Sequence, residues 1–368
     1  MVRKHRAGIL VACIVAAIAL AVIVVMTRSN EPQATPAPTP DHGLISEQVS
    51  WPIGETTVYA TITRPDGNGP YPAVVLVART AGPDRDWNVP GVPGTNGSGR
   101  LLAEELARRD FATIRYDHRY TGQGAQENTP HLAGNISLAS HVEEMSGAVE
   151  ALLEQDYVDP DHIYVLSHGE SSFLALNYHL DHDGPIAGLI LAALPYRSLA
   201  DLFIEQVQEQ FQHLPERDEI VAGCEALIAS FLEGEPFVPH PDVPPALNNY
   251  VSSLYDPRSL PFLREILPLD PADLLTRLTV PVLIVIGQKD IQINWQTDAA
   301  LLQAATAHLP HIVYEFPQDA DHVLKHQPKP REELSQADIW EYSAEGRVLD
   351  PEAVRVLIEW LTQQSQAD

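Results

Sequence analysis

Cysteine is scarce in this chain, with two in 368 residues. Cys13 lies in an apolar N-terminal run, and Cys224 lies far from it in a segment with a helical pattern. Two cysteines placed in this way give neither a disulfide framework nor the closely spaced ligands of a zinc site. Cys224 is therefore expected to be a small buried apolar residue.

Positive charge is also in short supply, since 23 lysines and arginines stand against 50 aspartates and glutamates, for a net charge of −27. Nucleic-acid binding depends on a basic surface that neutralises phosphates, so this balance argues against nucleic acid as a partner. A solvated acidic surface that keeps the domain soluble is the simpler interpretation. The sequence has no HExxH motif, no P-loop and no G-x-G-x-x-G turn after a strand, so no metal or organic cofactor is expected.

The first 26 residues have the pattern of a membrane anchor. Basic residues at positions 3 to 6 precede an uncharged run from Gly8 to Met26, which is about long enough to cross a bilayer as a helix. Charge at that end predicts that residues 1–7 stay in the cytoplasm and that the rest faces outward from the cell membrane. The run ends without a small-residue cleavage site, and few apolar residues precede the lipoprotein-like box at Cys13. We therefore predict an uncleaved single-pass anchor over 8–26 rather than a signal peptide.

A proline-rich linker over 27–43 is predicted to tether a folded domain that begins at Leu44. Two strand-like stretches suggest an antiparallel start, and continuous apolar runs typical of buried parallel strands follow, with amphipathic helices between them. This alternation predicts an α/β fold with a mostly parallel sheet covered by helices on both faces. The predicted strands are 49–53, 57–63, 73–78, 112–116, 163–166, 186–194, 282–286 and 312–316, and the predicted core helices are 101–109, 140–155, 296–308 and 348–363.

The alternation stops between Pro195 and Val280. This interval holds no convincing strand but has helical patterns over 199–212, 219–232 and 272–278, interrupted by a proline-rich stretch from Pro236 to Pro245. We therefore predict a core of 44–196 and 276–368 with a helical cap inserted over 197–275. An insertion here is expected to lie over the carboxyl ends of the strands, where open α/β sheets bind ligands.

The most informative segment runs from Tyr164 to Phe173 and reads Tyr-Val-Leu-Ser-His-Gly-Glu-Ser-Ser-Phe. An apolar strand enters a sharp turn of small residues, and a helical pattern begins at once. This is the setting of a nucleophile elbow, in which G-x-S-x-G presents a serine on a strained strand-to-helix turn.

The elbow resembles the Gly-His-Ser-Glu-Gly-Gly of the α/β-hydrolase superfamily, especially its esterase and serine aminopeptidase-like members. Here the register reads Ser-His-Gly-Glu-Ser-Ser, so the resemblance places Gly169 where an active hydrolase has serine. Glycine readily adopts the unfavourable backbone angles of that position, which cost other residues about 1–3 kcal/mol. The turn is therefore expected to survive without the attacking oxygen. Ser167 and Ser171 are the candidates for a substitute nucleophile, although neither occupies the apex.

The resemblance also implies the other two members of a catalytic triad. Asp290 follows a buried strand as the family's acid does, and His322 follows the next strand, where the family has its histidine. The chain order of elbow, acid and histidine is that of α/β-hydrolases. Asp290 could instead simply cap the loop before the helix that starts near Trp295, and His322 is one of 15 histidines.

An oxyanion hole is implied at the N–H of Glu170 and in the loop of Arg79 and Thr80, which follows the first buried parallel strand. Related esterases have His-Gly-Ser-Gly in this loop and then Asp-Arg-Asp. This chain has Ala-Arg-Thr-Ala over 78–81 and keeps Asp-Arg-Asp over 84–86. Arg79 is expected to turn outward to an acidic neighbour, or else to fill the old pocket or clamp an anionic ligand. Residues 115–119, Arg-Tyr-Asp-His-Arg, resemble a further strand-end segment of the family.

Three classes of function follow from these patterns. The favoured hypothesis is a membrane-anchored, catalytically impaired hydrolase that binds an ester- or amide-like small molecule or a protein partner through the old cleft. The alternative is an active carboxylesterase or peptidase, in which Asp290 and His322 activate a water or a neighbouring serine. The third is a structural envelope protein, against which the cap argues because an inert scaffold has little reason to enclose a cleft.

Overall fold

A computed structural model describes residues 43–80, 82–181 and 184–366. The predicted anchor over 8–26 and all but the last residue of the predicted linker lie outside these ranges. Within them, no helix is both long enough and apolar enough to cross a membrane.

One sheet of eight strands, in the order β1-β2-β4-β3-β5-β6-β7-β8, organises the chain. β1 pairs with β2 and β2 with β4 in antiparallel register, whereas every pair from β4 to β8 is parallel. The α/β fold predicted from the alternation is thereby confirmed. The strands are β1 Leu44–Ile53, β2 Thr56–Pro65, β3 Tyr71–Val77, β4 Ala112–Tyr116, β5 Val158–His168, β6 Gly188–Ala192, β7 Val282–Val285 and β8 Ile312–Glu315.

Helices cover both faces of the sheet, which explains why its central strands are apolar without a break. In β3, Val74 and Leu76 pack into a core shared with α2 (Ser98–Ala107) and α12 (Pro351–Ser365). Val75 and Val77, which alternate with them, point into a second core on the other face. The second core includes residues of α4 (Leu138–Leu153), α5 (Ser172–Asp181) and α11 (Thr297–Thr306).

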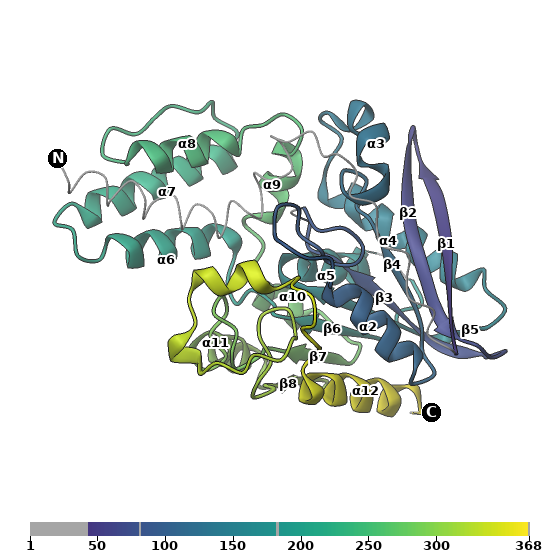
Figure 1. Ribbon diagram of the computed structural model, residues 1–368. Helices are drawn as coiled ribbons and strands as arrows, with labels where there is room; N and C mark the ends of the chain where they lie inside the picture. The colour runs from purple at the N-terminus through teal and green to yellow at the C-terminus, as the bar shows by residue number, and fades with distance from the viewer. Residues whose placement is uncertain (1–42, 81, 182–183, 367–368) are drawn as a thin grey trace.

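Five helices stand between β6 and β7, and α6, α7 and α8 form a lobe on the side of the molecule opposite β1 and β2 (Figure 1). The last proline of the proline-rich stretch is the first residue of α8, which starts at Pro245. Proline is tolerated at a first helical position, where its missing N–H is not needed. The five helices are α6 Leu199–Phe211, α7 Arg217–Glu233, α8 Pro245–Ser253, α9 Leu260–Ile266 and α10 Pro271–Thr276.

Some short elements were not anticipated from sequence. α3 (Ala125–Leu132) carries Pro130 within it, and α9 is only seven residues long, so neither presents a clear helical period. The remaining short elements are the 3-10 helices η1 Gly122–Gly124, η2 Gly169–Ser171, η3 Arg331–Glu333 and η4 Gln336–Glu341.

Candidate functional site

The strand-to-helix turn predicted around Gly169 is formed. β5 ends at His168, Gly169 opens the 3-10 helix η2, and α5 follows directly. Gly169 has a φ of 62°, in the left-handed region that glycine enters at little cost. The backbone of the elbow is therefore that of a strained turn, held by a residue that carries no side chain.

The two serines considered as substitute nucleophiles are committed to other hydrogen bonds. The Ser171 hydroxyl is fully buried and accepts from the His168 N–H at 3.1 Å while contacting the Val77 and His168 carbonyls. The Ser167 hydroxyl, also fully buried, lies 3.2 Å from that of Ser172. Neither hydroxyl is hydrogen-bonded to His322 among the described residues.

Ser171→Ala tests this structural role. Because the substitution leaves the buried His168 N–H without its acceptor, we expect the free energy of unfolding to fall by about 1–3 kcal/mol. Urea unfolding followed by circular dichroism measures the loss. Ser172→Ala, which removes a neighbouring buried hydroxyl with no backbone partner among those described, is the matched control and should cost less. An unchanged stability of Ser171→Ala would contradict the assigned role.

Asp290 and His322 meet as the order of the motifs predicted. His322 Nδ1 donates to Asp290 Oδ2 at 2.8 Å, and both side chains are buried. The other carboxylate oxygen accepts the N–H groups of Gln292 and Ile293 at 2.7 and 3.0 Å. Asp290 therefore holds its loop and orients the imidazole at the same time, so the two interpretations made from sequence are compatible.

His168 joins the elbow to the loop of His322. Its Nε2 donates to the His322 carbonyl at 2.8 Å, and its ring stacks on Trp87 with centroids 5.2 Å apart. Burial, then the neighbouring His322 and Arg79, hold the pKa of His168 well below its usual range. This imidazole is therefore neutral at physiological pH and acts as a hydrogen-bond donor between the two loops.

Arg79 lies over the elbow. A Cβ built on Gly169 would be 3.0 Å from Arg79 Cδ and 3.4 Å from its Cγ. Within the described part of the chain, Arg79 makes no ion pair, so the expectation that it turns outward to an acidic neighbour is wrong. The physical reason is that glycine leaves space at the apex, and the aliphatic part of Arg79 fills it.

The remaining oxyanion-hole candidates are adjacent in space. The Thr80 hydroxyl donates to Glu170 Oε1 at 3.3 Å, linking the loop after β3 to the residue that follows Gly169. Glu170 lies in the first turn of η2, where backbone N–H groups have no partner within the helix. The structure thus brings Glu170, Thr80 and Arg79 together around the elbow.

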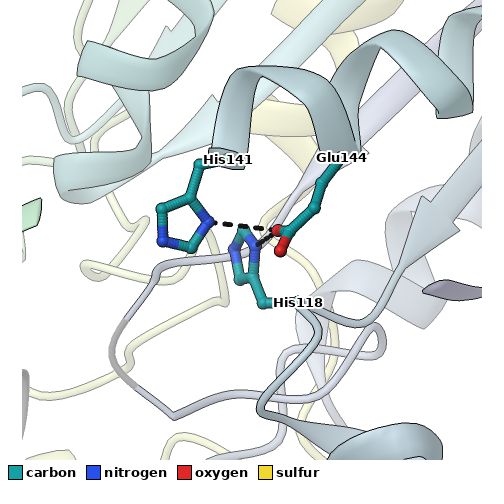
Figure 2. A group of neighbouring side chains, drawn as sticks. All are labelled: His118, His141 and Glu144. Carbon is teal, nitrogen blue, oxygen red and sulfur yellow. Dashed lines mark hydrogen bonds and ion pairs between the residues drawn. The ribbon is translucent and has the colours of Figure 1, made fainter. Parts of the chain in front are cut away.

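A buried ion cluster, made of His118, Arg119, His141 and Glu144, was not foreseen from sequence. Figure 2 shows His118, His141 and Glu144 of this cluster. One carboxylate oxygen of Glu144 is 2.7 Å from His118 Nδ1 and 3.1 Å from His141 Nδ1. The other accepts from Arg119 Nε at 2.8 Å. His118 was visible as part of the Arg-Tyr-Asp-His-Arg segment, but no local pattern ties it to α4.

The ion cluster fixes the loop that carries Arg79. His118 Nε2 donates to the Ala78 carbonyl at 3.1 Å, and the Tyr120 hydroxyl donates to the Thr80 carbonyl at 2.6 Å. The carbonyls on either side of Arg79 are therefore both held from the segment that follows β4. The position of the Arg79 backbone depends on the ion cluster as much as on β3.

Burial would raise the pKa of Glu144, but the charge of His141 and hydrogen bonds from both histidines hold it well below its ordinary value. Burial would lower the pKa of His118, yet the hydrogen bond and charge of Glu144 outweigh burial and raise it. For His141 burial prevails and lowers the pKa. His118, His141 and Glu144 could hold a metal ion among the described residues, but Arg119 already places a cation on the carboxylate.

Two further motifs from the sequence, the Asp-Arg-Asp segment 84–86 and the segment 115–119, are joined by ion pairs. Arg85 pairs with Asp117 at 2.7 Å, and Arg115 pairs with Asp86 at 2.7 Å. These reciprocal, nearly buried pairs attach the Asp-Arg-Asp segment to the end of β4. Gly122 closes against the Asp117 carboxylate, where a Cβ would lie 2.1 Å from its Cγ.

Comparison with known proteins identifies the family of the chain. Residues 88–327 match the family model for the alpha/beta hydrolase fold, and the chain belongs to this family. It is 26% identical over 236 residues to Esterase EstD from Thermotoga maritima, an alignment that covers 63% of this chain and 50% of that protein. The chain thus matches about half the length of this relative.

Solved structures with a similar fold include Est1E from Butyrivibrio proteoclasticus, at 14% identity and a TM-score of 0.48, covering 87% of this chain and 99% of that one. Proline iminopeptidase from Mycobacterium smegmatis also has 14% identity and a TM-score of 0.48, with 86% and 98% covered. Family membership rests on the family model rather than on these distant likenesses.

Proposed function

We propose that this chain is a catalytically impaired α/β-hydrolase, tethered outside the cell membrane by its N-terminal segment, that binds a ligand in the cleft beside the elbow. The observation that carries the proposal is the residue at the apex of the elbow. Gly169 supplies no nucleophile, and Arg79 lies across the position where a serine side chain would project. Loss of a triad nucleophile typically costs about a factor of 10⁶ in kcat.

The retained Asp290–His322 pair supports one rival function. An imidazole oriented through Nδ1 can use Nε2 as a general base toward a water, and the 2.8 Å contact with Asp290 provides that orientation. Hydrolysis would then proceed without a covalent intermediate. Such a route is slower than the acyl-enzyme route, because it needs the water itself to be positioned and the oxyanion hole to be intact.

Hydrolysis of 4-nitrophenyl acetate and butyrate by the purified full-length protein tests the proposal. We expect the wild-type rate to equal that of His322→Ala, since no nucleophile is in place for the imidazole to activate. A wild-type rate well above buffer that His322→Ala abolishes would show an active enzyme and overturn the proposal. His308→Ala is the control, because His308 is exposed in the turn after α11.

A further inference from the structure

The site beside the elbow is closed in this structure. The cavity there has a volume of about 20 Å³, which is room for one water molecule. Its walls come from the loop after β3 with the start of α2, from His168, and from Val323 next to His322. Tyr342 and Ser343, from a later part of the chain, complete them. A ligand therefore reaches the elbow only after part of this wall moves.

Tyr342 belongs to a segment that we call the strap, residues 331–345, which contains η3 and η4. The Tyr342 ring lies against the imidazole of His322, with the ring centroids 6.2 Å apart and the planes inclined by 23°. The strap is part of the connection 316–350 between β8 and α12, which holds no α-helix or strand. Connections of this length are uncommon and usually functional. The strap thus covers the histidine of the acid–histidine pair.

The strap is weakly anchored to the core. The structure describes all of it, and the buried residues in it are Asp338 and Ser343, both of them polar. Trp340, its largest side chain, is 48% exposed. The opposite wall of the cavity, in contrast, is tied to β4 by two ion pairs. Segments with few buried apolar contacts open locally at a lower free energy than core elements do. The strap can therefore move while the sheet stays folded.

Lys325 is the inner attachment of the strap. Its side chain is fully buried, and Nζ donates to the Tyr342 carbonyl at 2.7 Å. The same ammonium group donates to the carbonyl of Asn96, in the loop after β3. The Asn96 N–H donates to the Ser343 carbonyl at 3.1 Å, and its side chain donates to the Ala344 carbonyl at 3.2 Å. One buried cation thus joins the two walls of the cavity.

Glu345 is the outer attachment of the strap. Its side chain is exposed, and Oε1 accepts from the Thr95 N–H at 3.1 Å and from the Thr95 hydroxyl at 3.0 Å. Water competes for hydrogen bonds at the surface, so this attachment breaks at small cost. Gly346 follows directly with a φ of 80°, and Pro330 precedes the strap at its other end. Both ends of the strap therefore have a residue that marks a change of chain direction.

We propose that the strap is a lid of the elbow site, which moves away to admit a ligand and is held shut by Lys325 and Glu345. The inference rests on the proposed binding role of the cleft. In the closed form Tyr342 covers His322 and the cavity is too small for anything larger than a water molecule. Because only the open form binds, the apparent affinity for any ligand is reduced by the fraction of molecules in which the strap is open.

Carbethoxylation of His322 by diethyl pyrocarbonate, followed by mass spectrometry of the full-length protein, tests the lid. Nδ1 of His322 is bonded to Asp290, so Nε2 is the reactive nitrogen and its rate reports access to the site. Glu345→Ala removes the outer attachment and should raise the rate about 2- to 10-fold, the factor for one hydrogen bond. Glu341→Ala, an exposed glutamate of the same strap, is the matched control and should leave the rate unchanged.

Lys325→Met and hydrogen exchange distinguish opening of the strap from general unfolding. Methionine removes both bonds of the buried ammonium group, so the His322 rate should rise at least about tenfold. Peptides of the strap should exchange faster in both variants, whereas β5 and β7 should keep their wild-type protection. Glu345→Ala, at an exposed position, carries the test if Lys325→Met does not fold. An unchanged His322 rate in Glu345→Ala, or a loss of protection in β5 equal to that in the strap, would overturn the inference.

The ester assay separates the two proposals. If wild type hydrolyses esters, the impaired-hydrolase proposal fails, while faster labelling of His322 in Glu345→Ala still supports the lid. If wild type is silent and the labelling rate does not change, the lid inference fails and the impaired hydrolase stands.

Discussion

Gly169→Ser combined with Arg79→Gly is expected to hydrolyse 4-nitrophenyl butyrate at least about 100-fold faster than the wild-type protein. The serine restores an attacking oxygen at the apex of a turn that already has the required backbone angle. The Asp290–His322 pair that would take its proton is in place at 2.8 Å. Glycine at position 79 opens the loop, so that backbone N–H groups can approach the developing oxyanion.

The two substitutions are expected to depend on each other. In Gly169→Ser alone, the new Cβ lies 3.0 Å from Arg79 Cδ, so the arginine must shift before the hydroxyl can be used. Its gain in rate should therefore be well below that of the double variant. Arg79→Gly alone adds no nucleophile and should gain nothing.

The control for this restored activity is His322→Ala placed on the double variant, which should return the rate to the wild-type level. A gain that persists without His322 would mean that the serine is not activated by the pair. A folded double variant with no gain would contradict the assignment of Gly169 to the nucleophile position. Single-turnover kinetics should show a burst of nitrophenol if an acyl-enzyme forms.

Glu144→Gln is expected to lower the free energy of unfolding by about 3–5 kcal/mol, a large fraction of the stability of a typical domain. The substitution leaves Arg119 and His118 buried around a neutral amide, although each makes a contact of 2.8 Å or less with the carboxylate. Urea unfolding measures the loss. Glu143→Gln is the matched control, because Glu143 is the preceding residue on α4 and is exposed. A loss no larger than that of Glu143→Gln would show that the ion cluster contributes little.

The same cluster sets a pH dependence. Because the pKa of Glu144 in the folded protein lies well below its ordinary value of 4.5, its contribution to stability is complete above that value and is lost as the pH falls toward the folded pKa. The wild-type protein should therefore lose stability on acidification below about pH 4.5 more steeply than Glu144→Gln does. The raised pKa of His118 acts in the opposite sense, since its contribution is complete below 6.5 and declines as the pH rises through the folded pKa.

The sheet and the order of the site motifs could be predicted because both depend on local signals. A run such as Ala73–Ala78 is apolar at consecutive positions because each face of its strand is covered, and that pattern is present in the sequence itself. The helix α8, which begins at Pro245, was not predicted, because its first residue also ends the proline-rich stretch.

Side-chain direction could not be predicted in the same way. The sequence allowed two positions for Arg79, one turned outward to an acidic neighbour and one filling the old pocket or clamping an anionic ligand. Its actual position depends on Gly169, which is 90 residues away in the chain and leaves space above the elbow. The partnership of Glu144 with His118 and the unpaired hydroxyl of Ser98 likewise arise only when β4, α4 and α2 are packed.

The sequence by itself determined the family fold, the elbow with glycine at its apex, and the acid and histidine that follow in order. Each of these is encoded in a short stretch whose periodicity or turn chemistry is local. Only the tertiary structure decided that Asp290 contacts His322 and that Arg79 covers Gly169. It also decided that a buried ion cluster holds the loop that carries Arg79. The reason is that distances and ion pairs between distant segments are set by packing around the sheet, which no local pattern contains.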